Sequence, residues 1–251
     1  MRTTTRLLVP LAAAALPFAA LAAPASAASG TSYQTTLNPL NHSTASGMAT
    51  VTVTGNQARV KVSWSGLAAS FGGGAYPHVQ HIHGGARGQC PTMAADQNGD
   101  GVVSTTEGAP AYGGIQTTLS TKGDTSPAAG TDIKIAPSGG SSNYARTINL
   151  SGGALSALRN GTAVIVVHGL DPATLSTKAQ KEKSDLVPSL PLAATSPALC
   201  GVLSSMPTGG VATGTGSTAG VEDLGLLAAG GGLLAAGGLL LVSRKRATAE
   251  I

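Results

Sequence analysis

Apolar and polar side chains alternate with a period of two along two neighbouring segments of this chain. In residues 48–54 threonines alternate with small or β-branched apolar residues, and residues 58–64 resume the alternation with two valines and Trp64 on one face. Successive side chains of a β-strand point to opposite faces, so this period predicts strands rather than helices. The intervening residues 55–57, Gly-Asn-Gln, are typical of a turn. The sequence therefore predicts a β-hairpin.

Further segments extend this pattern along the chain. Five of them are rich in β-branched residues and bounded by Gly, Pro, Asn or Ser: Val79 to His83, Ile115 to Leu119, Arg146 to Leu150, Thr162 to His168 and Leu199 to Leu203. Residues 151–159 favour a helix of one or two turns. Short strands separated by turn signals are typical of sandwiches and barrels. We therefore expect an all-β fold, an antiparallel Greek-key sandwich or barrel.

Composition excludes two classes of protein. Hydrophobic residues make up 42% of the chain and the formal net charge is only +4, which argues against a disordered protein. Five of the fifteen basic residues lie at the chain ends, at Arg2, Arg6 and residues 244–246, and the ten between residues 28 and 205 nearly balance eight acidic residues there, so a basic nucleic-acid-binding face has no support. Aromatic residues, at 3%, are too few for a base-stacking platform. We expect no nucleic-acid partner.

The N-terminal residues 1–27 have the pattern of a secretory signal peptide. A basic start is followed by the apolar residues 7–23 and then by the small-residue site Ala25-Ser26-Ala27. Cleavage after Ala27 would deliver the chain to an oxidising compartment. The alternative is a first membrane helix that stays in place, which Pro10 and Pro17 disfavour.

The C-terminal region has the pattern of a membrane anchor. Residues 224–242 contain no charged residue, and as a helix they would span about 28 Å, close to the thickness of the hydrocarbon core. Ser243-Arg244-Lys245-Arg246 follows directly, and basic residues favour the cytoplasmic side. We expect a transmembrane helix at 224–242, a cytoplasmic basic tail at 243–251, and a domain on the extracellular face of the membrane. A buried core helix is the alternative.

Between these ends the sequence predicts one domain and one linker. Residues 28–203 suffice for a single domain of ordinary size. Residues 204–223 are rich in Gly, Ser and Thr and would span about 25 Å as a flexible coil. Met206-Pro207-Thr208-Gly209 is similar to the signals that sortases cleave, although the Leu-Pro-x-Thr-Gly pattern is not present. Covalent wall attachment is therefore the alternative to a membrane anchor.

Two cysteines predict one disulfide. Cys90 and Cys200 are the only cysteines of the chain, and disulfides persist in the oxidising compartment to which a signal peptide leads. A bridge that closes so long a loop stabilises a fold by up to about 4.7 kcal/mol in the chain-entropy account. Two free thiols that act as metal ligands are the alternative.

Residues 96–107 have the pattern of a calcium-binding loop. The segment Asp-Gln-Asn-Gly-Asp-Gly-Val-Val-Ser-Thr-Thr-Glu fits the EF-hand loop at every specified position. The predicted ligands are the side chains of Asp96, Asn98, Asp100, Ser104 and Glu107 and the carbonyl of Val102. No amphipathic helices are predicted beside the loop, so we expect a structural ion rather than a calcium-triggered switch. The alternative is a solvated, turn-rich loop without an ion.

Three histidines are candidates for a second metal site. His81 and His83 lie two residues apart on a predicted strand, so their imidazoles share one face. His168 ends the apolar run of residues 164–167 and would be the third ligand. Three imidazoles suit copper or zinc. The alternative is a set of hydrogen-bonded histidines without an ion.

The two remaining histidines are expected at the surface. His78 has the opposite strand parity to His81 and His83, so it would join their face only through a bulge. His42 lies in the turn-like stretch Asn41-His42-Ser43. Neither is predicted to bind a metal.

The order of four short motifs resembles that in Cu/Zn superoxide dismutases. These motifs are His81-Ile82-His83-Gly84, Cys90, Val166-Val167-His168 and Cys200-Gly201-Val202. In that family the corresponding histidines ligate copper and the two cysteines form a disulfide, so the resemblance implies the same roles here. Residues 48–67 followed by His81 are also similar to the CHRD domain, a secreted β-domain found in many bacterial proteins. The resemblance covers residues 37–203.

Two departures from the dismutase pattern bear on activity. No histidine lies between His83 and His168 to bridge copper and zinc, and Pro197 stands where dismutases carry an arginine that guides superoxide. Without the arginine no positive charge steers a small anion to the site.

We expect a secreted, membrane-anchored CHRD-like module with a structural calcium loop and a possible three-histidine metal site. Such a module would act in binding or envelope architecture through a partner that the sequence does not identify. The alternatives are a copper-handling protein that uses His81, His83 and His168, and a divergent copper-dependent superoxide dismutase.

Overall fold

The computed structural model describes residues 30–207. The predicted signal peptide, transmembrane helix and basic tail, together with the linker beyond Pro207, lie outside the described residues. Among the helices of residues 30–207, none is long and apolar enough to cross a membrane.

Strands form most of the described regular structure. They are β1 Thr31–Pro39, β2 Ser46–Thr54, β3 Gln57–Ser65, β4 Ser70–Phe71, β5 Gly74–Ala75, β6 Gln80–Gly84, β7 Gly114–Thr118, β8 Ser141–Asn149, β9 Val164–His168, β10 Pro197–Val202 and β11 Ser204–Ser205. The α-helices are α1 Thr105–Tyr112, α2 Gly152–Arg159 and α3 Leu192–Thr195. The short 3-10 helices are η1 Met93–Ala95, η2 Pro127–Ala129, η3 Ile133–Ile135, η4 Pro172–Thr174 and η5 Ala179–Lys181.

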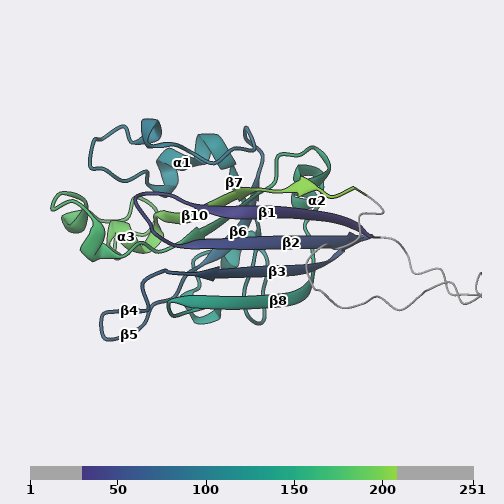
Figure 1. Cartoon of the computed structure of the whole chain (residues 1–251), viewed down its shortest axis with the longest axis horizontal. Coiled ribbons are helices and arrows are strands. Elements are labelled where there is room, and N and C mark those ends of the chain that lie inside the picture. The colour runs from purple at the N-terminus through teal and green to yellow at the C-terminus, as the bar shows by residue number, and fades with distance from the viewer. Residues whose placement is uncertain (1–29, 208–251) are drawn as a thin grey trace, which may run out of the picture. The chain divides into compact units, whose positions relative to one another are not determined.

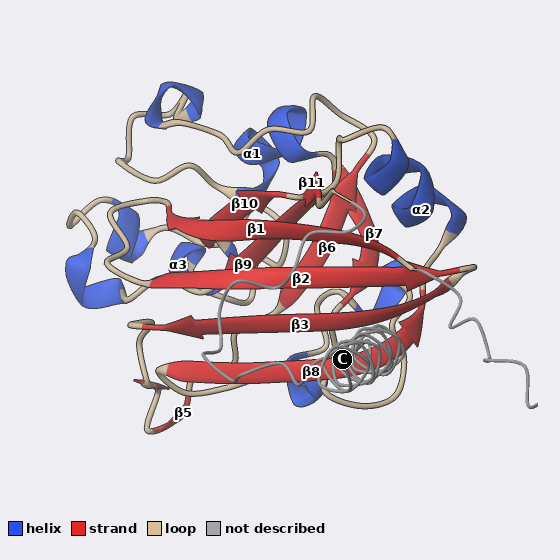
Figure 2. Ribbon diagram, turned by 45° about the vertical axis from the view of Figure 1, so that its right-hand side comes forward, coloured by secondary structure: helices blue, strands red, loops and turns tan. Residues whose placement is uncertain are grey.

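Nine strands form one curled antiparallel sheet, a half-barrel (Figure 1). The order is β7-β6-β9-β10-β1-β2-β3-β8, and β11 pairs with the start of β1. Strand β1 joins the two halves of the sheet, β7-β6-β9-β10 and β2-β3-β8. The end of β1 pairs with β10 through Asn38↔Cys200 and Pro39↔Leu199. The short helices lie at the periphery of the strands (Figure 2). The expectation of a mainly β, antiparallel fold is confirmed.

The predicted hairpin is confirmed as β2 and β3. Their register runs from Ser46↔Ser65 to Thr54↔Gln57, which leaves Gly55 and Asn56 as a two-residue turn. Gly55 has a φ of 65°, a left-handed conformation that glycine adopts without steric cost. Alternate side chains of β3, ending with Trp64, are buried as the period-two pattern predicts.

The main core lies between the two halves of the sheet, and β9 is buried on both of its faces. Ile165 and Val167 belong to the main core, together with Val60 and Trp64 of the opposite half. The other face of β9 belongs to a second, smaller cluster, formed by Tyr112, Val164, Val166 and Cys200. A short strand that is apolar on both sides is therefore covered on both sides.

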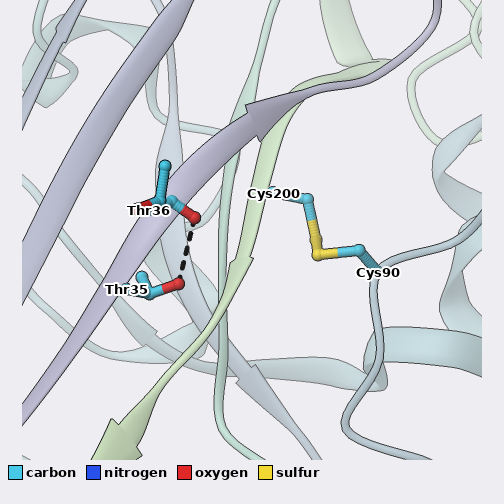
Figure 3. Close-up of a disulfide and its surroundings, with 4 residues drawn as sticks. All are labelled: Thr35, Thr36, Cys90 and Cys200. Carbon is cyan, nitrogen blue, oxygen red and sulfur yellow. Dashed lines mark hydrogen bonds between the residues drawn. A yellow bond between two sulfur atoms is a disulfide. The ribbon is translucent and has the colours of Figure 1, made fainter.

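The predicted disulfide is present. Cys90, in the loop after β6, is bonded to Cys200 of β10, with 5.8 Å between their Cα atoms. Figure 3 shows the bridge beside β1, where the hydroxyl of Thr35 donates to the carbonyl of Thr36. Because both cysteines are in this bond, neither is a free thiol ligand. The bridge fastens the long β6–β7 connection to the sheet.

The helix predicted at residues 151–159 is present as α2, and Ser151 caps it by accepting from the amide of Ala154. Other elements differ from the sequence-based expectation. Strand β1 and helix α1 were not predicted. The sheet also continues beyond Leu203, because Ser204 and Ser205 pair with β1.

Candidate metal centre

Strands β6 and β9 bring the three predicted histidines together. The strands are antiparallel neighbours in which His81 pairs with Val166 and His83 with Val164. The three rings lie on the same side of the sheet, with centroids 5.2 to 6.0 Å apart. His81 and His83 are 2% exposed and His168 is 3% exposed. One potential ligand atom from each lies within 4.8 Å of the others. The predicted grouping of the histidines is confirmed.

A backbone carbonyl fixes the tautomer of each imidazole. His81 Nε2 donates to the Gly130 carbonyl at 2.9 Å, and His83 Nδ1 donates to the Gly113 carbonyl at 2.9 Å. His168 Nδ1 donates to the Thr195 carbonyl at 2.6 Å. A carbonyl only accepts hydrogen bonds, so the proton of each neutral ring must reside on the nitrogen that faces it.

The other nitrogen of each ring therefore carries a lone pair. In residues 30–207, His81 Nδ1, His83 Nε2 and His168 Nε2 are buried and make no hydrogen bond. An unsatisfied buried polar atom costs about 1–3 kcal/mol, so three in one place are unfavourable without a shared partner. A metal ion accepts all three lone pairs at once, and metal-binding histidines typically donate their other ring N–H to a carbonyl or carboxylate that orients the ring.

Electrostatics keep these rings neutral. Burial, followed by the neighbouring His168 and His83, lowers the pKa of His81 well below its usual value. Burial and His168 lower the pKa of His83 to about 3, and burial lowers the pKa of His168 to about 4. Metal ligation requires the unprotonated nitrogen, so the site is ready for a metal ion at neutral pH.

Two glycines bring their carbonyls to the rings. Gly113 has a φ of 86°, and a Cβ there would collide with the carbonyl of Gly84. A Cβ on Gly130 would lie 2.5 Å from Ile115 Cδ1 and 3.4 Å from His81 Nε2. Gly113 directly follows α1, whose last residue, Tyr112, packs against His83 with ring centroids 4.7 Å apart. Residues outside β6 and β9 thus complete the site.

His78 is buried, so the expectation of a surface position was wrong. Its Nδ1 lies 2.9 Å from the His168 carbonyl and its Nε2 3.0 Å from the Ala68 carbonyl. Its ring also packs edge-on against Trp64, with centroids 5.1 Å apart. Strand parity correctly separated His78 from the metal face, but the opposite face is core rather than solvent because the sheet is curled. His42 is exposed, as expected.

The predicted calcium ligands lie in a loop whose oxygens are engaged by backbone amides. Asp96 accepts from the amides of Gly99, Asp100 and Gly101 at 2.8 to 3.3 Å. Asn98 Oδ1 accepts from the Asp100 amide at 2.9 Å. The Asp100 carboxylate accepts from the amide of Val102 and the side chain of Asn98. These are turn-forming bonds that hold the loop together.

The end of the loop caps α1. Glu107 accepts from the amides of Gln97 and Ser104, and the Ser104 hydroxyl accepts from the Glu107 amide, which completes a capping box. Ser104 also donates to Asp185 at 2.7 Å. Within residues 30–207, the metal-type grouping found is the histidine trio and not the acidic side chains of this loop. The calcium hypothesis is therefore not supported.

A cavity of about 240 Å³ adjoins the three histidines. Besides the histidines, its lining is mostly apolar and includes Val79, Ile115, Val187 and Leu190. None of the described residues that line it is Lys, Arg, Asp or Glu. Sequence reasoning did not find this cavity because its walls come from loops far apart in the chain.

No model of a known protein family matches the chain, and no curated protein matches it. The residues of the site are therefore the basis for the function proposed below.

Proposed function

We propose that this protein is a copper-handling protein whose β-domain holds one copper ion through His81 Nδ1, His83 Nε2 and His168 Nε2. Two observations on the described residues support this most strongly: one buried nitrogen of each ring has no hydrogen-bond partner, and the three side chains offer ligand atoms within 4.8 Å of one another. Three carbonyls fix the rings in the tautomers that ligation requires. The ion would replace three unfavourable buried acceptors with three bonds.

The charge around the site favours copper in its monovalent state. Imidazole suits both copper and zinc, but of the two only copper has a monovalent state. The trio is neutral, and no acidic side chain in the described lining of the adjoining cavity would balance an ion. Burying a charge without a counter-charge is costly, so a singly charged ion is easier to hold than a doubly charged one. We therefore assign Cu(I) as the resident ion.

The resemblance to Cu/Zn superoxide dismutases and CHRD domains is part of this proposal. The strand order supports a Greek-key, dismutase-like topology, since β10 lies beside β1 and β8 lies beside β3. The disulfide is compatible with a secreted domain, anchored to the extracellular face of the membrane by residues 224–242. That such a domain binds a partner in the cell envelope is proposed from the sequence alone.

Dismutase activity is the less favoured version of this proposal. Dismutases carry a further histidine that bridges copper and zinc. Of the five histidines here, the two outside the trio do not offer it, because His42 is exposed and both ring nitrogens of His78 face backbone carbonyls. No cationic side chain among the described residues lines the cavity beside the trio. A small anion such as superoxide therefore has no positive charge to attract it.

Elemental analysis of the protein tests the proposal. The untagged chain is exposed to equimolar copper and zinc under reducing and oxidising conditions, desalted, and analysed for metal per chain. We expect about one copper per chain in the wild type and in His42→Asn, and none retained in His81→Gln or His168→Gln. His42→Asn is the matched control because His42 is exposed and has a φ of 61°, which asparagine tolerates. Zinc in place of copper, or copper retained by both trio variants, overturns the proposal.

A further inference from the structure

The mouth of the cavity beside the trio is unusually apolar for a protein surface. The described residues include five exposed large hydrophobic side chains, and three of them line this cavity: Phe71 at 40%, Ile133 at 50% and Leu186 at 47% exposure. Single exposed apolar residues are common, but a group around a concave site indicates a binding surface.

These side chains come from three separate segments. Phe71 lies in the β4–β5 hairpin and stacks on Tyr76 with ring centroids 5.0 Å apart, at an interplanar angle of 26°. Ile133 begins η3, where the Asp132 side chain accepts from the Lys134 amide. Leu186 lies in the loop after η5, where the Ser184 hydroxyl accepts from the amides of Leu186 and Val187. Each apolar side chain is therefore presented by a hydrogen-bonded or paired backbone.

The inner end of the cavity differs from its mouth. The buried residues of the lining are the three histidines, Tyr76, Gly130 and Thr195. The cavity thus joins an apolar entrance to the side chains of the three histidines that would hold an ion. A molecule that fits this gradient has an apolar body and one donor atom at its inner end.

The size and charge of the cavity limit the molecule further. A dry apolar cavity of about 150 Å³ is large enough for benzene, so about 240 Å³ accommodates one ring with a small substituent. Because no charged side chain among the described residues lines the cavity, an ionised ligand would lose its hydration without compensation.

We propose that this cavity binds a neutral, single-ring molecule whose one donor atom points at the metal ion held by the trio. The apolar half of this inference stands on the cavity alone, and the donor half rests on the proposed copper site. The ligand class is set by the gradient from Phe71, Ile133 and Leu186 at the mouth to the histidines inside.

Fluorine NMR titrations of the full chain test the inference with three probes of one ring size. 4-Fluorobenzonitrile carries a neutral nitrogen donor, 4-fluorotoluene carries none, and 4-fluorobenzoate is an anion. We expect the two neutral probes to bind the metal-free protein at least roughly tenfold more tightly than the anion. Copper loading should tighten binding of the nitrile and leave the toluene unchanged.

Variants at the mouth assign the binding to the cavity. Ile133→Asn combined with Leu186→Asn should weaken both neutral probes at least roughly fivefold, because both side chains are exposed and their replacement spares the core. Met48→Asn is the matched control, since Met48 is an exposed apolar residue on β2 that does not line this cavity. Equal weakening by the control, or equal affinity for the anion, overturns the inference.

The two proposals fail in different ways. If copper loads but no ring binds, the cavity inference is wrong and the copper proposal stands. If the rings bind but no copper loads, the copper proposal is wrong, and with it the donor half of the inference. If copper loads and the nitrile and toluene respond to it alike, the donor half alone is overturned.

Discussion

The histidine trio and the loop of residues 96–107 both match metal-binding patterns, yet the structure treats them differently. In the trio, three buried nitrogens have no partner and lie close together. In the loop, the carboxylates of Asp96, Asp100 and Glu107 accept hydrogen bonds from backbone amides. The loop pattern matched more positions in sequence, but its oxygens are used to build turns and a helix cap.

A metal site is distinguished from a sequence pattern by ligand atoms that lack any other hydrogen-bond partner. Asp, Asn, Ser and Gly serve both calcium loops and tight turns, because their short side chains bond readily to nearby amides. Imidazoles on a buried strand have no such local alternative, so their free nitrogens need a partner. The loop nonetheless contributes to the trio: it caps α1, and α1 leads to the Gly113 carbonyl that orients His83.

The sharpest way to break the comparison is to substitute each region and measure copper. Replacing His83 by Gln should reduce copper affinity by at least about 100-fold, since loss of a group that only hydrogen-bonds to a metal ligand costs about 10- to 100-fold. Asp100→Asn in the loop should leave the affinity unchanged. Competition with a chromophoric copper chelator measures both variants. An equal loss of copper affinity in the His83→Gln and Asp100→Asn variants would show that the trio and the loop do not differ in metal binding.

The stability of the metal-free protein in acid depends on the buried histidines of the trio. The pKa of His83 is about 3 and that of His168 about 4 in the folded domain, below the unfolded value near 6.5. Between these values the unfolded chain binds protons that the folded chain does not, so stability of the metal-free protein falls as pH drops from 6.5 toward 4.

Melting curves of the metal-free protein across this window measure that effect. The melting temperature should fall steeply below pH 6.5 and change little from these groups above it. A double variant, His83→Gln with His168→Gln, should show a shallower fall. Parallel curves for the variant and the wild type would mean that the trio is not the source of the acid sensitivity.

Removal of the disulfide should separate stability from metal binding. Cys90→Ala with Cys200→Ala should lower the free energy of unfolding by about 2–5 kcal/mol, because the bridge closes a loop with a sequence separation of 110 residues. Copper stoichiometry should stay at one per chain under conditions where the variant is folded. Urea denaturation and elemental analysis provide the two readouts. Loss of copper from the folded variant would mean that the bridge positions the trio.

The smallest effect is expected at the helix cap. Ser104→Ala should destabilise the domain by about 1 kcal/mol because α1 loses its capping hydroxyl. Thr106→Ala, at an exposed neighbouring position, is the control and should change little. Calcium should not raise the melting temperature of the wild type. A calcium-dependent rise that disappears in Asp96→Asn would restore the calcium hypothesis.

Alternation and parity made much of the fold and site predictable. The hairpin of β2 and β3 follows from residues 48–64 because one face of each strand must be buried. The same rule placed His81 and His83 on one face. The pairing of Cys90 with Cys200 followed from there being two cysteines.

The parts that were missed depend on contacts between distant segments. The carbonyls of Gly113, Gly130 and Thr195 belong to loops and helix ends, and any residue can supply a carbonyl, so no sequence pattern marks them. Helix α1 contains Gly108 and Pro110, which are poor helix formers. Gly108 is required there because a Cβ would lie 2.6 Å from the Tyr112 ring.

X-ray absorption at the copper edge of the loaded wild-type protein tests the assignment of copper to the trio. We expect a first coordination shell that contains three imidazole nitrogens. After loading under reducing conditions, we expect the edge of Cu(I). A first shell dominated by oxygen or sulfur, or one that is unchanged in the His168→Gln variant, would contradict the assignment of the ion to His81, His83 and His168.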